Sequence, residues 1–174
     1  MSASRYVTME FADAVQNGVL SQFSDLSKAL IDASSMIYME KAGFLAEVAA
    51  AITLAAPKEI LDETGFETIA VHAIAMNPKA VSNDEKLIGC ALALNLPVIS
   101  DDRKVLLQLA RGKIPFFNAL MMLNYLLFKG DISFESHSAF FQRLRGFSRY
   151  SDQVLAFSKD VYWHIVNQPE RIAL

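Results

Sequence analysis

Short apolar runs alternate with helical patterns along most of this chain, and this alternation constrains the fold more than any other feature. The apolar runs, each of strand length, lie at 29–31, 97–100 and 114–117. The helical patterns lie at 33–42, 82–95, 102–113 and 118–130. Strands that alternate with helices form parallel sheets with helices on both faces. We therefore expect a three-layer α/β/α fold with a central parallel sheet of about four or five short strands.

The remaining segments complete this pattern in the middle of the chain and at its two ends. A helix is expected at 44–53, and Pro57 is expected at the first position of a helix that ends at Gly65. Residues 67–76 are compatible with a strand or a buried helix. No linker composition divides the chain, so we expect one domain over 1–174. Its predicted parts are an N-terminal helical segment 1–27, a core of about 28–133 and a C-terminal helical extension 134–174, with a break near 146–151.

Composition excludes several classes of protein. Hydrophobic residues make up 53% of the chain and charged residues 20%, which argues against disorder. The single cysteine, Cys90, excludes an intrachain disulfide framework and a cysteine-rich zinc site, and we expect it in the core.

The longest uncharged run, 114–128, is short for a membrane span and contains Asn118 and Asn124. We expect a cytoplasmic protein with no membrane association. A net charge of −3 argues against broad electrostatic binding of nucleic acid, while a local basic patch stays open.

Aspartates stand where two of the predicted strands end. Asp32 follows the run 29–31, and Asp101 and Asp102 follow the run 97–100. Ligands of open parallel sheets bind at the carboxyl ends of the strands. If these two strands are neighbours, the acids meet across one crevice. Asp32 and Asp102 also have a structural explanation, because each could cap the helix that follows.

Two further acids could join them. Glu63 lies in the last turn of its predicted helix, where a carboxylate opposes the helix dipole. Ser82 and Glu85 have the spacing of a capping box, which explains Glu85, and any acid is favourable in this first turn. Asp84 is not needed by the box and is therefore the better functional candidate. Clustered carboxylates without a paired base repel one another unless a cation is bound. Oxygen ligands suit Mg²⁺ or Mn²⁺, and such a site supports hydrolysis of phosphodiesters.

The order and spacing of these residues resemble the PIN-domain ribonucleases. The resemblance rests on Asp32-Ala33-Ser34 after an apolar run, Pro57 followed by Glu63, Asp84 before an apolar helix face, PVISDD, and the stretch 113–133. It covers roughly residues 28–133. The family pattern often has threonine where this chain has Ser100.

The resemblance implies a metal-dependent endoribonuclease. The implied catalytic residues are Asp32, Glu63, Asp84 and Asp102. The implied ligands of Mg²⁺ or Mn²⁺ are Asp32, Asp84, Asp102 and Asp101. The expected substrate contacts are Ser34, Ser100, Arg103 and Lys104. The implied partners are RNA, an antitoxin protein as in toxin-type relatives, and further copies of the chain in a homodimer or larger oligomer. The alternative is a PIN-like module that binds RNA or protein without cutting.

The segment 140–150 interleaves aromatic residues with arginines. Such a pattern suits stacking on single-stranded RNA. An amphipathic helix with Phe140, Leu144 and Phe147 buried and the arginines in solvent explains it more simply. The three histidines, His72, His137 and His164, lack the spacing of a metal site.

Overall fold

In the described part of the chain, a five-stranded parallel sheet forms the centre of the molecule. The computed structural model describes residues 18–65, 71–75 and 82–168. The strand order is β3-β2-β1-β4-β5, and all neighbouring strands pair in parallel. The strands are β1 (Lys28–Ile31), β2 (Thr53–Pro57), β3 (Val71–Ile74), β4 (Val98–Ile99) and β5 (Phe116–Phe117).

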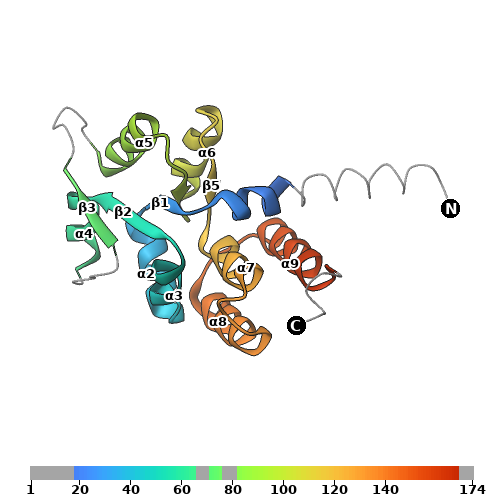
Figure 1. The fold of residues 1–174 in the computed structure, drawn as a ribbon. Coiled ribbons are helices and arrows are strands. Elements are labelled where there is room, and N and C mark those ends of the chain that lie inside the picture. The colour runs from blue at the N-terminus through green and yellow to red at the C-terminus, as the bar shows by residue number, and fades with distance from the viewer. Residues whose placement is uncertain (1–17, 66–70, 76–81, 169–174) are drawn as a thin grey trace.

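Helices cover both faces of this sheet (Figure 1). After a helical segment at 18–25 come α2 (Ala33–Ala42), α3 (Leu45–Ala51), α4 (Lys58–Thr64), α5 (Asn83–Leu94), α6 (Arg103–Arg111), α7 (Ala119–Lys129), α8 (Phe134–Phe147) and α9 (Asp152–Val166). Helices α5 and α6 lie on one face, and α2, α3 and α7 lie on the other (Figure 1). The predicted three-layer α/β/α class is confirmed.

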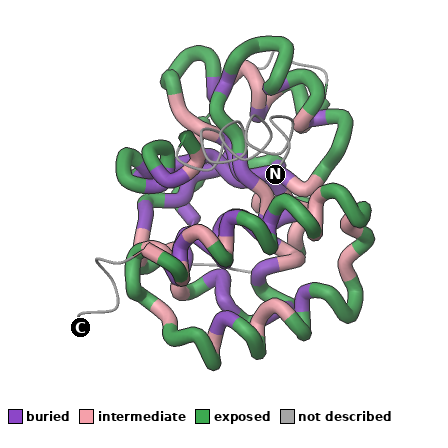
Figure 2. Tube along the Cα trace, turned by 90° about the vertical axis from the view of Figure 1, so that its right-hand side faces the viewer, coloured by how far each residue is buried: buried purple, intermediate pink, exposed green. Residues whose placement is uncertain are grey.

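The C-terminal helices pack on the second helical layer. Helix α8 contacts α2 and α7, and α9 contacts α7. Leu144, Val161 and Ile165 are buried in the same hydrophobic core as the strand residues. Helix α7 therefore lies between the sheet and the last two helices, and its residues 119–127 are all buried. Figure 2 shows buried and exposed positions alternating along the helices, as expected for helices that pack one face on the core.

Strand β2 was missed by the sequence prediction. The expected helix 44–53 ends earlier, at Ala51, and Thr53–Pro57 is a strand. The segment TLAAP has neither helical nor alternating periodicity, because this strand is buried on both faces. Pro57 closes the strand and occupies the N-cap of α4 rather than its first helical position. The ambiguous segment 67–76 contains β3; its residues 67–70 and 76 lie outside the described part of the chain.

Helix α5 buries a narrower stripe than predicted. Leu87, Cys90 and Ala91 are buried, as the sequence predicts. The sequence predicts Leu87, Ile88, Ala91 and Leu92 on one buried face of this helix. Leu92 is 63% exposed, so the prediction is wrong for that residue. Positions three and four apart share a face of a helix, whereas Leu92 lies five residues after Leu87 and turns toward solvent. Over the described residues, every helix is too short or too polar to cross a bilayer.

Candidate functional site at the switch point of the sheet

The order in which the strands are added to the sheet reverses at the boundary between β1 and β4. The chain moves outward from β1 to β2 and β3, then returns to place β4 on the other side of β1. Ligands of open α/β sheets bind at such a switch point, outside the carboxyl ends of the strands. Ile31 pairs with Ile99, so Asp32 and Ser100 leave the sheet side by side. The predicted convergence of these two strand ends is therefore present.

Asp32 is buried and its carboxylate is held by three serines. It is 7% exposed and caps α2 by accepting a hydrogen bond from the Ser35 amide at 2.7 Å. The same Oδ1 accepts from the Ser34 hydroxyl at 2.9 Å, and Oδ2 accepts from the Ser100 hydroxyl. Burial raises the pKa of Asp32, and the three hydrogen bonds oppose that rise. The cap role anticipated for Asp32 is confirmed.

Asp101 is a second, half-buried carboxylate beside the first. It accepts hydrogen bonds from the Ser35 hydroxyl at 2.7 Å, from the Ala119 amide at 3.1 Å and from the Tyr150 phenol. Burial raises the pKa of Asp101 above its ordinary value, and these donors oppose the rise. Ser35 thus joins Asp32 and Asp101 into one hydrogen-bonded unit, which we call the buried carboxylate pair.

The buried carboxylate pair connects parts of the fold that are distant in sequence. Ser35 comes from α2, Ala119 is the first residue of α7, and Tyr150 comes from the connection between α8 and α9. A carboxylate at the start of α7 is also stabilised by the helix dipole. Burial and the neighbouring Asp101 charge raise the pKa of Tyr150, so the phenol stays protonated and donates. Sequence reasoning missed Tyr150 as a partner of the site, because nothing local links it to an acid 49 residues away.

Asp102 is exposed, unlike its neighbour. It caps α6, as anticipated, by accepting from the Lys104 amide at 2.7 Å and the Val105 amide at 3.3 Å. Its own amide donates to the Ser100 hydroxyl at 3.1 Å. Ser100 therefore bridges the Asp32 carboxylate and the Asp102 backbone amide. Arg103 and Lys104 are exposed in the first turn of α6, beside this bridge.

Asp84 and Glu63 lie in solvent near Asp102. Burial and then the charges of Asp102 and Glu63 raise the pKa of Asp84, so Asp84 lies within electrostatic reach of both acids. Glu63 accepts a hydrogen bond from the Asn83 side chain at 3.0 Å, which ties the end of α4 to the start of α5. The predicted capping box of Ser82 and Glu85 is present and leaves Asp84 outside it. We call Glu63, Asp84 and Asp102 the exposed acidic group.

The donor chemistry of the exposed acidic group suits a hard cation, although the arrangement is open. Within the described ranges, no set of three or more histidine, cysteine, aspartate or glutamate side chains is arranged to hold a metal ion. Mg²⁺ commonly takes only one or two protein carboxylates and completes its shell with water and substrate phosphate. Both hydrogen bonds to the Asp102 carboxylate are accepted by Oδ1, which leaves Oδ2 as a donor atom for a cation.

The aromatic residues of 140–150 pack inward rather than forming a stacking surface. Phe140 contacts Phe44 with ring centroids 5.6 Å apart, and the Arg143 guanidinium lies 4.8 Å from the Phe140 ring centroid. Phe147 meets Tyr38 edge to face. Leu144 is buried as expected, whereas Phe140 is half-buried and Phe147 is 37% exposed. These contacts favour the amphipathic-helix interpretation.

Comparison with known proteins gives no relative. No protein-family model matches the chain, and neither the curated proteins nor the solved structures contain a match.

Proposed function

We propose that this protein hydrolyses RNA phosphodiester bonds with bound Mg²⁺ or Mn²⁺, as a PIN-like endoribonuclease. The observation that carries the proposal is the hydrogen-bonded bridge from the Asp32 carboxylate through the Ser100 hydroxyl to the Asp102 backbone amide, which fixes both acids at the switch point of the sheet. Asp84 is within electrostatic reach of Asp102. A functional site is expected at this edge on topological grounds alone. An acid that is held within reach of two other carboxylate charges, as Asp84 is, is more readily explained by a bound cation than by stability.

Each residue has a distinct role in this proposal. Asp102 and Asp84 hold the cation, while Glu63 orients water beside it. Asp32 acts through Ser100: its carboxylate accepts the hydrogen bond of the Ser100 hydroxyl and so fixes that hydroxyl at the end of β4. The bound cation would activate water and stabilise the leaving oxygen. Ser34, Arg103 and Lys104 lie beside the bridge in sequence and space, and would contact the RNA backbone.

Metal titration and RNA cleavage together test the proposal. Mn²⁺ is titrated by calorimetry, and cleavage of a fluorescent single-stranded RNA is followed with and without Mn²⁺. Asp84→Asn and Asp102→Asn should each weaken Mn²⁺ binding and abolish cleavage. Asp131→Asn is the matched control: this exposed acid follows the far end of α7, roughly 18 Å along the helix from Ala119. Failure of Mn²⁺ to bind in the millimolar range or tighter, with equal cleavage by all variants, would refute the proposal.

A second candidate is a PIN-like module that binds RNA or protein without cutting. The open arrangement of the exposed acidic group favours it, because the described acids lack a three-residue metal set. The Asp32 carboxylate, moreover, already accepts three hydrogen bonds. RNA binding that is unchanged by EDTA, with no cleavage in Mn²⁺, would select this candidate over the nuclease.

Self-association and an antitoxin partner belong to the same proposal. Leu107, Phe116 and Phe157 are large apolar side chains that are 51%, 38% and 38% exposed. We propose that they contribute to a contact with a second copy or with an antitoxin in the cytoplasm. Removal of residues 134–174 is a poor test, because it strips Leu144 and Val161 from the core. Sedimentation of Phe157→Glu is sharper: an unchanged profile would exclude this surface from the self-contact.

A further inference from the structure

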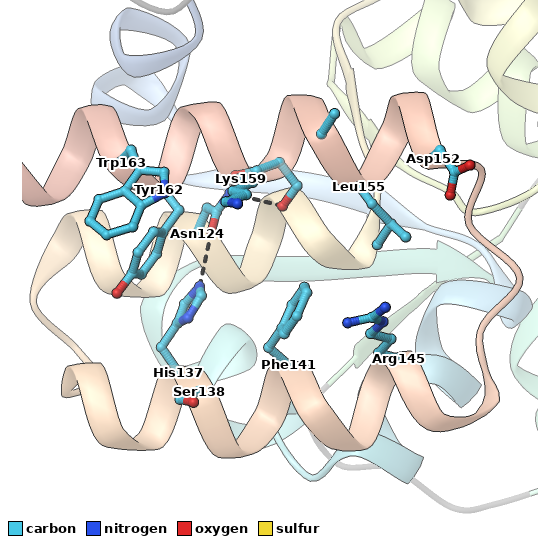
Figure 3. Close-up of a pocket in the computed structure, with 12 residues that line it drawn as sticks. Asn124, His137, Ser138, Phe141, Arg145, Asp152, Leu155, Lys159, Tyr162 and Trp163 are labelled. Atoms are coloured by element: carbon cyan, nitrogen blue, oxygen red, sulfur yellow. Dashed lines mark hydrogen bonds between the residues drawn. The ribbon is translucent and has the colours of Figure 1, made fainter.

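A pocket lies between α7, α8 and α9, within the C-terminal part of the fold. Its cavity volume is about 520 Å³, in the range of sites that hold small organic ligands. Figure 3 shows α8 and α9 facing each other across it, with Phe141 pointing into the gap from α8. Its lining contains none of the residues of the switch-point site. We call it the α7–α9 pocket.

A buried polar network forms one wall of the α7–α9 pocket. The Asn124 amide nitrogen donates to the Ser158 carbonyl at 2.8 Å and to its hydroxyl at 3.1 Å. A carbonyl only accepts, so this contact fixes the orientation of the Asn124 amide. Asn124 Oδ1 then faces His137 Nε2 at 3.0 Å, and Nε2 must carry the proton (Figure 3). His137 Nδ1 is therefore left as an acceptor.

His137 contributes polarity to the pocket without charge. Burial lowers the pKa of His137 to about 4, so the ring is neutral at physiological pH. A neutral ring with one bound and one available nitrogen is suited to accept a hydrogen bond from a ligand.

Aromatic rings line the walls. The rings of His137 and Phe141 are nearly parallel, with an interplanar angle of 7° and centroids 6.5 Å apart. Tyr162 lies 4.9 Å from His137, and Trp163 lies 5.4 Å from Tyr162 (centroid to centroid). Figure 3 shows Tyr162 reaching from α9 toward His137 on α8. Ring-lined walls of this kind favour a flat aromatic ligand.

Two cations line the pocket, with one acid. Arg145 lies on α8 and Lys159 on α9, and both are exposed, as is Asp152. The ion pair found among the described residues joins Lys86 to Glu59, away from this pocket. Arg145 and Lys159 therefore form no ion pair with a described carboxylate. The net charge of the lining is therefore positive, which favours an anionic group on the ligand.

We propose that the α7–α9 pocket binds a small planar aromatic molecule that carries an anionic group, with the ring lying against the Phe141 and Tyr162 side chains and the anion at Arg145 and Lys159. A nucleotide and an aromatic carboxylate share this chemistry. The proposal is independent of the nuclease proposal, because it uses neither the metal nor the switch-point residues.

Trp163 provides an intrinsic reporter, since it is the single tryptophan of the chain and lines the pocket. Its fluorescence is titrated in EDTA with AMP and with benzoate, and with the neutral analogues adenosine and benzamide. Saturation-transfer NMR on the same samples gives a second readout. At least one anion should bind saturably, about tenfold more tightly than its neutral analogue. AMP alone indicates a nucleotide site, and benzoate alone a carboxylate site.

Variants locate the binding. Arg145→Gln should weaken binding of the anion about tenfold and leave the neutral analogue unchanged. Ser138→Phe, which fills the pocket from an exposed position of α8, should abolish binding of both. Arg149→Gln is the control, because Arg149 is an exposed arginine outside the lining. The proposal is overturned if no probe gives a saturable signal in either readout, or if anion and neutral analogue bind equally and Arg145→Gln changes nothing.

Discussion

Asp101 and Asp102 are adjacent in the chain and belong to two different environments. Asp101 is enclosed by donors from α2, α7 and Tyr150, whereas Asp102 faces solvent and caps a single helix. The buried carboxylate pair holds segments together, whereas the carboxylates of the exposed acidic group face solvent. Of two neighbouring acids at a strand end, one can therefore be enclosed while the other faces solvent, because successive residues that leave a strand point in different directions.

The largest expected effect comes from removal of the buried carboxylate of Asp101. Asp101→Ala leaves the Tyr150 phenol, the Ser35 hydroxyl and the Ala119 amide without their acceptor. Unsatisfied buried donors are costly, so we expect a loss of about 3 kcal/mol in the free energy of unfolding. Urea denaturation measures it. Asp131→Ala is the control and should change stability by less than about 0.5 kcal/mol. A similar small change for Asp101→Ala would show that the buried pair does not hold the fold together.

Loss of a single donor should have a smaller effect. Tyr150→Phe keeps the ring contact with Tyr38 and removes only the hydroxyl that reaches Asp101. We expect a loss of about 1.5 kcal/mol in the free energy of unfolding, the magnitude of a hydrogen bond to a charged acceptor. In the Asp101→Ala background the same change should cost much less. Additive losses in this double-mutant cycle would mean that the two groups do not interact.

The buried pair should also leave a pH signature. Burial raises the pKa of Asp32 above 3.8 in the folded state, so the folded protein holds its proton to higher pH than the unfolded chain does. The stabilisation from this proton is complete below the unfolded pKa and is lost as pH rises through the folded pKa.

Asp32→Asn removes this titration. The stability of the parent relative to Asp32→Asn should therefore fall as pH rises from about 4, by at most about 1.4 kcal/mol per pH unit. Thermal unfolding of both proteins over that range measures the difference. An increase with pH would mean that the hydrogen bonds to the carboxylate outweigh its burial.

The smallest effect on stability is expected at Asp102, where function and structure can be separated. Asp102→Ser keeps a side chain that can cap α6 and removes the carboxylate. The free energy of unfolding should change by less than about 0.5 kcal/mol, because serine and aspartate are similar caps. Calorimetry should show Mn²⁺ affinity at least tenfold weaker. If the variant binds Mn²⁺ as tightly as the parent does, Asp102 is not a ligand of the metal ion.

Local patterns were enough to predict much of this molecule. The helix caps Asp32, Ser82 and Asp102 are recognisable because a cap bonds only to the next two or three residues. Strand β2 was missed because a strand buried on both faces has no periodicity to detect. The pocket network of His137 and Asn124 was not anticipated either, because its partners lie on different helices.

The amino-acid sequence by itself determined the α/β class and the placement of acids at the ends of β1 and β4. Both follow from periodicity and from the residues adjacent to each strand. Only the tertiary structure decided which acid is enclosed. Tyr150 reaches Asp101 because α8 packs on α2 and α7, so a contact across 49 residues follows from helix packing. Such contacts depend on the positions of whole elements, and no short stretch of sequence encodes those positions.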